Sequence, residues 1–253
     1  SIEGPIVKDK GSFIISCRRT YVDVFLKLSK DFKNNALYFY DFNLKSNYRI
    51  DEKNRIFLSG YFGKDVLNLG DIYGIDWGNK TGTLRWNRLI NPKTFSNTSV
   101  SYSNYNYKSQ IFSGGSSSKT NSKITDWNLK HEFQYFPNTK NSIRIGYNSI
   151  YHNITPSNIS DNNTIGRKKK NRYGWDNALY VNNTMEVTNN LSFDYGLRFS
   201  TYSIIGGDTY RIFEKSVLKD SIVLASGNIG KTYYNPEPRF QFTYTLNEIS
   251  SIK

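Results

Sequence analysis

The chain has 253 residues, of which 37% are hydrophobic and 16% aromatic, and its formal net charge is +13. The 20 tyrosines and 16 phenylalanines favour β-strands over helices. No run of about 18 apolar residues occurs, which excludes a transmembrane helix, but a membrane β-strand needs only about 10 residues with apolar side chains at alternate positions. Lys and Arg are spread along the chain, which argues against nucleic-acid binding.

Catalytic and metal-binding motifs are missing from the sequence. The single cysteine, Cys17, excludes an internal disulfide and a cysteine-based zinc site. No glycine-rich phosphate loop, pair of metal ligands or nucleophile motif occurs. We therefore expect no catalytic residue, no metal site and no cofactor, and we do not expect the chain to be an enzyme.

Taken in chain order, the first predicted strand begins at Gly11 and is followed by a long segment, residues 20–36. In that segment Val24, Phe25, Leu28 and Phe32 have helical spacing, which predicts a short amphipathic helix.

Residues 38–50 show a clear alternation with period two. Tyr38, Tyr40, Phe42 and Leu44 fall on one parity, and polar residues occupy most of the other. A strand separates these two sets onto opposite faces, whereas a helix mixes them. The same alternation recurs around residues 127–135, 191–199 and 240–246 and more weakly at 55–63, 142–151 and 175–187. Residues 75–88 and 95–107 are poorly patterned and are predicted as strands mainly from their flanks.

The connections between predicted strands alternate in length. Short polar turns are predicted at residues 51–54, 91–94, 137–141, 188–190 and 247–248, each with the Asn, Asp or Pro that tight turns require. Longer segments lie at 20–36, 65–74, 113–123, 156–172 and 205–232. Outer-membrane barrels have this asymmetry of short periplasmic turns and long external loops. We therefore predict an all-β fold: about ten antiparallel strands of a transmembrane β-barrel.

The parity predicts which side chains face lipid and which face the lumen. Lipid-facing candidates are Tyr40, Phe42, Leu44, Leu129, Phe133, Phe193, Tyr195, Leu197, Phe242 and Tyr244. Lumen-facing candidates are Asn43, Lys45, Asn47, Lys130, Glu132, Asp194 and Arg198. The one dense basic run, Arg167, Lys168, Lys169 and Lys170, is either a solvated loop or an external contact for an anionic ligand or a lipopolysaccharide phosphate.

Several stretches resemble TonB-dependent outer-membrane receptors of the SusC-like kind. Residues 1–6, 8–14 and 18–21 resemble the junction between the plug domain and the first barrel strand. Residues 55–61, 77–79, 84–87, 95–99 and 102–105 resemble the strands that follow. The resemblance divides the chain into a junction, 1–10, and barrel strands with their loops, 11–253.

That resemblance implies a barrel of about 22 strands in the outer membrane of a Gram-negative bacterium, filled by a plug and importing a metal chelate, a vitamin or an oligosaccharide. Implied partners are outer-membrane lipid and lipopolysaccharide, the plug domain, TonB and a surface lipoprotein. This chain has no plug and fewer strands than the family, so we expect a fragment covering the first half of the barrel.

Two alternatives stay open at this point. One is a complete ten-stranded outer-membrane barrel with an enzymatic site at its outer mouth, for which His152 with Asp161 is the only candidate pair. The other is a soluble β-sandwich used for adhesion.

Overall fold

The computed structural model describes every residue except 114–115, 162–169, 248 and 253. The strands are β1 (Ile2–Val7), β2 (Gly11–Arg19), β3 (Asn35–Arg49), β4 (Asn54–Leu69), β5 (Tyr73–Asn91), β6 (Thr94–Ser113), β7 (Ser116–Asn138), β8 (Asn141–Asp161), β9 (Arg172–Glu186), β10 (Leu191–Ile205), β11 (Thr209–Glu214), β12 (Val217–Val223), β13 (Ile229–Thr245) and β14 (Ser251–Ile252). One short helix, α1 (Val22–Leu26), lies between β2 and β3. Within the described residues, no helix is long and apolar enough to cross a bilayer.

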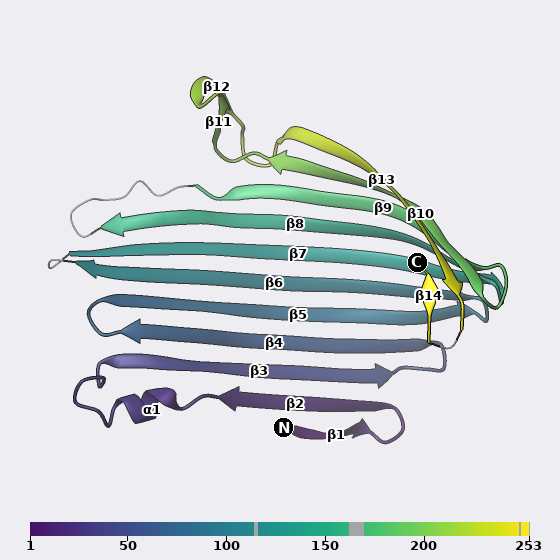
Figure 1. Ribbon diagram of the computed structural model, residues 1–253, viewed down its shortest axis with the longest axis horizontal. Helices are drawn as coiled ribbons and strands as arrows, with labels where there is room; N and C mark the ends of the chain where they lie inside the picture. The colour runs from purple at the N-terminus through teal and green to yellow at the C-terminus, as the bar shows by residue number, and fades with distance from the viewer. Residues whose placement is uncertain (114–115, 162–169, 248, 253) are drawn as a thin grey trace.

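Twelve of the strands form one sheet in the order β1-β2-β3-β4-β5-β6-β7-β8-β9-β10-β13-β14 (Figure 1). β11 and β12 pair only with each other and form a hairpin that projects beyond the ends of β10 and β13. The ten strands predicted between Gly11 and Leu246 are β2 to β10 and β13, which confirms the predicted all-β fold. The poorly patterned segments 75–88 and 95–107 form the central strands β5 and β6.

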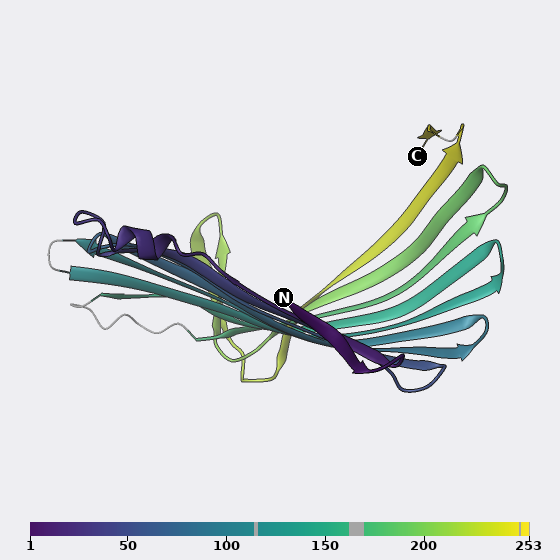
Figure 2. The same cartoon turned by 90° about the horizontal axis from the view of Figure 1, so that it is seen from below.

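The sheet is a single twisted and curved layer (Figure 2). Ala178 and Ile205 are the only buried hydrophobic residues in the part of the chain that the structure describes. A soluble β-sandwich buries one face of its sheet under a second sheet. The only second sheet among the described residues is the small β11–β12 hairpin, so the sandwich alternative does not fit this fold.

Cross-strand pairing carries the alternation of the sequence across the whole sheet. One row of paired residues runs from β3 to β10 through Tyr48, Ile56, Trp86, Thr98, His131, Tyr147, Leu179 and Phe199. Paired residues point to the same face of a sheet, so the largely apolar parity of each strand lies on one side. We call this side the apolar face and the other side the polar face.

The apolar face is the convex one. On β10, Tyr195, Leu197 and Phe199 are 41%, 50% and 44% exposed. The residues between them, Gly196 and Arg198, are half-buried. Side chains diverge on the outside of a curved sheet and converge on its inside, so the difference in exposure places the apolar face outward.

The strands are staggered as they are in a closed barrel. Tyr48, next to the last residue of β3, shares its row with Phe199, which lies eight residues after Leu191 at the start of β10. Seven strand-to-strand steps separate β3 from β10. With about 3.3 Å of rise per residue and about 4.8 Å between strands, this stagger corresponds to a tilt of about 35°. Barrel strands tilt by about 35–45°.

The predicted short turns all lie at one end of the sheet, where they join β3 to β4, β5 to β6, β7 to β8, β9 to β10 and β13 to β14. Four of them use the same device, in which an Asp or Asn side chain accepts a backbone N–H two residues later. Asp51 accepts from Lys53 at 2.7 Å, and Asn138 accepts from Lys140 at 3.0 Å. The side chain of Asn54 and the backbone N–H of Lys53 hold the pKa of Asp51 below its ordinary value.

The other end of the sheet differs from the prediction in how far the strands continue. Residues 65–74 and 113–123 are predicted as loops, but β4 ends only at Leu69 and β7 begins at Ser116. β6, β7 and β8 contain 20, 23 and 21 residues, about twice what is needed to cross a bilayer. Backbone pairing requires no apolar side chain, so the ladder continues past the apolar part of each strand.

The predicted helix is also shorter than expected, because α1 contains Val24 and Phe25 but neither Leu28 nor Phe32.

Candidate functional site on the polar face

Polar and charged side chains gather on the polar face of β7 to β10 and β13. We call this set the charged cluster, and its members are Lys130, Glu132, Arg144, Tyr180, Asp194, Arg198, Glu237 and Arg239. Its centre is one row of paired positions, in which Glu132 pairs with Gly146, Gly146 with Tyr180, and Tyr180 with Arg198. Four of the predicted lumen-facing residues, two on β7 and two on β10, therefore lie in one cluster.

Tyr180 links the cations and the carboxylate at the centre of the cluster. Its hydroxyl donates a hydrogen bond to Glu132 Oε2 at 2.5 Å, and Lys130 Nζ lies 3.6 Å from the same oxygen. The guanidinium carbon of Arg198 lies 5.9 Å from the centroid of the Tyr180 ring. The ring, the carboxylate and the two cations thus form one connected group across β7, β9 and β10.

The other two carboxylates of the cluster also have partners. Glu237 accepts hydrogen bonds from Ser200 Oγ at 2.7 Å and from Arg239 at 2.9 Å. Asp194 accepts a hydrogen bond from Thr184 Oγ1 at 3.0 Å. The cluster is consequently a network whose acidic groups are held in fixed positions, with the longer basic side chains around them.

Glycine at position 146 makes room for the Tyr180 ring. A Cβ built on Gly146 would lie 2.2 Å from Tyr180 Cζ, much closer than two carbon atoms can approach. The same arrangement recurs nearer the end of the sheet opposite the short turns, which we call the long-hairpin end. There a Cβ on Gly174 would lie 2.5 Å from the hydroxyl oxygen of Tyr202. A ring that lies over a glycine of the neighbouring strand fills the space left by the missing side chain.

The charged cluster lies at the depth of the apolar band on the opposite side of the same strands. Tyr180 stands between Leu179 and Val181, which point to the apolar face and are 61% and 45% exposed. At one level of the sheet, exposed apolar side chains thus face one side and a charged network faces the other.

The remaining predicted lumen-facing residues lie on the same face at the other side of the sheet. Asn43 donates a hydrogen bond to Asp41 at 3.2 Å, and Asp41 also binds Arg18 at 2.5 Å. Asn47 donates to Ser12 Oγ at 2.8 Å. Lys45 lies between them on the same parity of β3 and is exposed.

His152 lies on the polar face nearer the long-hairpin end, between two aspartates of neighbouring strands. Its Nδ1 is 2.8 Å from Asp126 Oδ1 and its Nε2 is 3.6 Å from Asp176 Oδ2. The side chain of Asp161, the partner considered in the sequence, lies outside the described residues. Both ring nitrogens of His152 thus face carboxylates that hold the ring between β7 and β9. Among the described residues, no group of His, Cys, Asp or Glu has a metal-binding arrangement.

The ten predicted lipid-facing residues share the apolar face. They are Tyr40, Phe42, Leu44, Leu129, Phe133, Phe193, Tyr195, Leu197, Phe242 and Tyr244. His131, which the parity also assigns to this side, accepts or donates a hydrogen bond with Thr98 Oγ1 at 2.8 Å and packs edge-on against Phe133.

Of the predicted external basic run, Lys170 is exposed, while Arg167, Lys168 and Lys169 lie outside the described residues. Other members of the charged cluster were missed in the sequence, namely Arg144, Tyr180, Glu237 and Arg239. Parity alone would have assigned Arg144 and Arg239 to the polar face, since both alternate with apolar residues of their strands.

Comparison with solved structures shows the fold. The chain is similar to the copper transporter OprC, with a TM-score of 0.67 and 9% identity over 94% of this chain and 40% of that one. It is similar to the ferric citrate transporter FecA, with a TM-score of 0.67 and 12% identity over 97% of this chain and 38% of that one. For the FrpB iron transporter from Neisseria meningitidis the TM-score is 0.65, with 11% identity over 96% of this chain and 42% of that one.

These similarities concern the fold, because each identity is low. The chain spans about two fifths of the length of the solved structures that it matches. No protein-family profile matches the chain, and no curated protein matches it by sequence. The fold is thus a staggered antiparallel sheet of the kind that forms part of a large β-barrel.

Proposed function

We propose that this chain forms part of the wall of a TonB-dependent outer-membrane transporter. The observation that carries the proposal is the contrast between the two faces at one depth: exposed apolar side chains such as Leu179 on the convex face and the charged cluster on the concave face. The fold shared with transporters of copper, ferric citrate and iron supports it, and so does the sequence resemblance to that family.

In this proposal the convex face contacts the hydrocarbon of the outer membrane, and the concave face surrounds a plug domain. In lipid every backbone N–H and C=O needs a partner, so the outer edges of β1 and β14 require further strands of the same barrel. A closed ten-stranded barrel is not favoured. The described strands form an open sheet, and the solved structures that the chain matches are more than twice as long as this chain. The contribution of this chain is to position and bind rather than to catalyse.

The charged cluster is the proposed contact for the plug. Its carboxylates are fixed by Tyr180, Ser200 and Thr184, so they present an ordered set of acceptors and donors at mid-depth. The proposed cargo is a scarce nutrient such as a metal chelate, a vitamin or an oligosaccharide. The SusC-like branch, and with it a surface lipoprotein partner, is assigned from the sequence resemblance alone.

The proposal is tested in the bacterium that makes the protein. The protein is expected in the detergent-soluble outer-membrane fraction, and its deletion is expected to abolish growth on one limiting nutrient from a panel of iron chelates, copper, cobalamin and oligosaccharides. Deletion of tonB should produce the same defect, because the family draws its energy from TonB. Recovery of the protein in the soluble fraction, or uptake that is unaffected by loss of tonB, would contradict the proposal.

A further inference from the structure

The apolar face changes character toward the long-hairpin end of the sheet. Four neighbouring strands, β4 to β7, place lysines there, and we call the one on each strand that lies nearest the apolar residues the lysine belt: Lys64, Lys80, Lys108 and Lys123. Lys80, Lys108 and Lys123 are exposed and Lys64 is half-buried. All four belong to the parity that carries Leu84, Val100 and Leu129 farther along the same strands.

Strand register places the four lysines in two neighbouring pairs, Lys64 with Lys80 and Lys108 with Lys123. Lys64 pairs with Gly78 and Lys123 pairs with Asn106, and these two pairs belong to one row across the sheet. Lys80 lies two residues from Gly78 of that row, toward the short turns, and Lys108 lies two residues from Asn106, toward the long-hairpin end. Both point to the same face as the row. Diagonal neighbours of this kind are about 7–8 Å apart between their Cα atoms, a spacing that lets two long side chains reach one ligand group.

On β7 the belt begins beyond the last aromatic residue of the apolar face. On β7 the order along this face is Leu129, Trp127, Thr125 and then Lys123. Trp127 packs against Tyr102 of β6 with ring centroids 4.9 Å apart. Aromatic side chains of this kind mark the boundary between hydrocarbon and headgroups, so the belt lies at and just beyond that boundary.

One contact shows how a lysine at this level is held. Lys80 Nζ lies 5.1 Å from the centroid of the Phe62 ring, so its aliphatic stem covers an aromatic residue of the band. Lysine stems cover apolar surface in this way while their ammonium groups reach the polar region.

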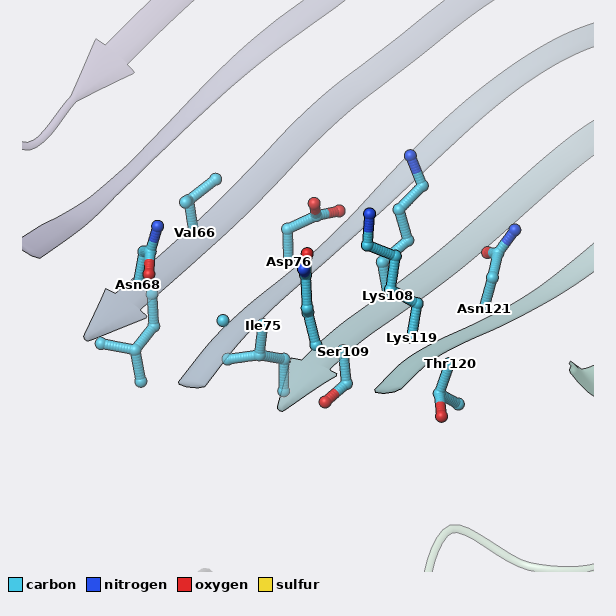
Figure 3. Close-up of a pocket in the computed structure, with 12 residues that line it drawn as sticks. Val66, Asn68, Ile75, Asp76, Lys108, Ser109, Lys119, Thr120 and Asn121 are labelled. Atoms are coloured by element: carbon cyan, nitrogen blue, oxygen red, sulfur yellow. The ribbon is translucent and has the colours of Figure 1, made fainter. Parts of the chain in front are cut away.

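The belt carries an excess of positive charge. Asp76 is the one carboxylate of the described residues in these rows of the apolar face, and its Oδ2 is 3.7 Å from Lys64 Nζ. Figure 3 shows Asp76 and Lys108 on the same side of the sheet as Lys119, which lies farther out, while Ile75 and Thr120 point to the other side. The hollow between these strand ends has a volume of about 510 Å³.

We infer that the lysine belt binds the phosphate groups of lipid A, the phosphorylated glycolipid anchor of lipopolysaccharide, at the outer surface of the barrel. The inference rests on the proposed function, which places the convex face in the outer membrane. Four lysines against one aspartate complement a ligand with two phosphates, and the adjoining apolar band, including Trp127 and Leu129, complements its acyl chains. Anionic lipid headgroups attract lysines at such a boundary.

The test uses the full-length protein purified from outer membranes in detergent and titrated with diphosphorylated lipid A, with bound lipid counted by native mass spectrometry. The belt variant combines Lys64→Gln, Lys80→Gln, Lys108→Gln and Lys123→Gln. The matched control removes the same charge at the short-turn end with Lys10→Gln, Lys53→Gln, Lys93→Gln and Lys140→Gln. We expect the belt variant to bind lipid A at least about tenfold more weakly and the control to remain within about twofold of the unchanged protein.

A variant with arginine at the four belt positions retains the charge and is expected to keep the affinity, which separates lost binding from lost folding. Unchanged affinity in the glutamine variant would overturn the inference. So would binding of dephosphorylated lipid A, or of phosphatidylglycerol, as tight as that of lipid A itself. A protein that is absent from the outer membrane would refute the proposed function instead, before any lipid is added.

Discussion

Replacement of Leu129 by arginine is expected to destabilise the barrel by about 2–4 kcal/mol, because the change puts a charge near the middle of the apolar band. Leu129 pairs with Val100 of β6, which in turn pairs with Leu84 of β5, and these side chains are 43%, 41% and 51% exposed on the convex face. In a bilayer that exposure is to hydrocarbon, where a guanidinium loses its water. The measurement is equilibrium unfolding in denaturant of the protein reconstituted in lipid vesicles.

Asn128→Arg is the matched control for this prediction. Asn128 is the preceding residue of β7 and points to the polar face, where its paired residue on β6 is Ser101. An arginine there meets water and the neighbouring Asp126, so the free energy of unfolding should change by less than about 0.5 kcal/mol. Equal destabilisation by the two changes would show that the faces do not differ in environment.

The second large effect is expected at Gly146. Gly146→Ala places a methyl group 2.2 Å from Tyr180 Cζ, so the ring must leave its position and its hydrogen bond to Glu132. Forced overpacking of this kind costs about 1–3 kcal/mol. We expect a loss of that size in the free energy of unfolding of the reconstituted protein.

A double-mutant cycle separates this cause from a general intolerance of change. Once Tyr180→Ser has removed the ring, Gly146→Ala should have little further effect, and the coupling between the two positions should be at least about 1 kcal/mol. Gly82, whose added Cβ would meet nothing within 4 Å, is the control position for the same substitution. Additive effects at 146 and 180 would mean that the ring does not depend on the glycine.

The strand order and the two faces follow from the sequence because barrel strands need only local information. Phe193, Tyr195 and Leu197 alternate with polar residues, and in a strand this alternation alone assigns each side chain to a face. Tight turns are equally local, as Asp51 illustrates by accepting the N–H groups of the residues that follow it.

The poor pattern of β5 and β6 has a physical reason. Their outer halves extend past the apolar band, where the apolar face also carries polar residues such as Lys80 and Asn104. Where both sides of a strand meet water, alternation in polarity disappears although the backbone pairing continues. The loops predicted at 65–74 and 113–123 were wrong for the same reason.

The charged cluster was predictable only in part, because it depends on the register between strands that are distant in the sequence. Lys130 and Arg198 were assigned to the polar face by parity. Nothing local brings Tyr180 to Glu132, which is 48 residues away. That contact requires β8 to lie between them with glycine at position 146.

The most direct test of the two-faced wall is a cysteine scan of residues 127–135 on β7 in intact outer membranes, with Cys17 replaced by serine. Cysteines at Trp127, Leu129 and Phe133 should react with a lipid-soluble probe and be protected from a water-soluble maleimide. Those at Asn128, Lys130 and Glu132 should be protected from the lipid-soluble probe and open to the maleimide, or shielded by the plug. Labelling that shows no alternation along β7, or that exposes Leu129 to water, would contradict the account.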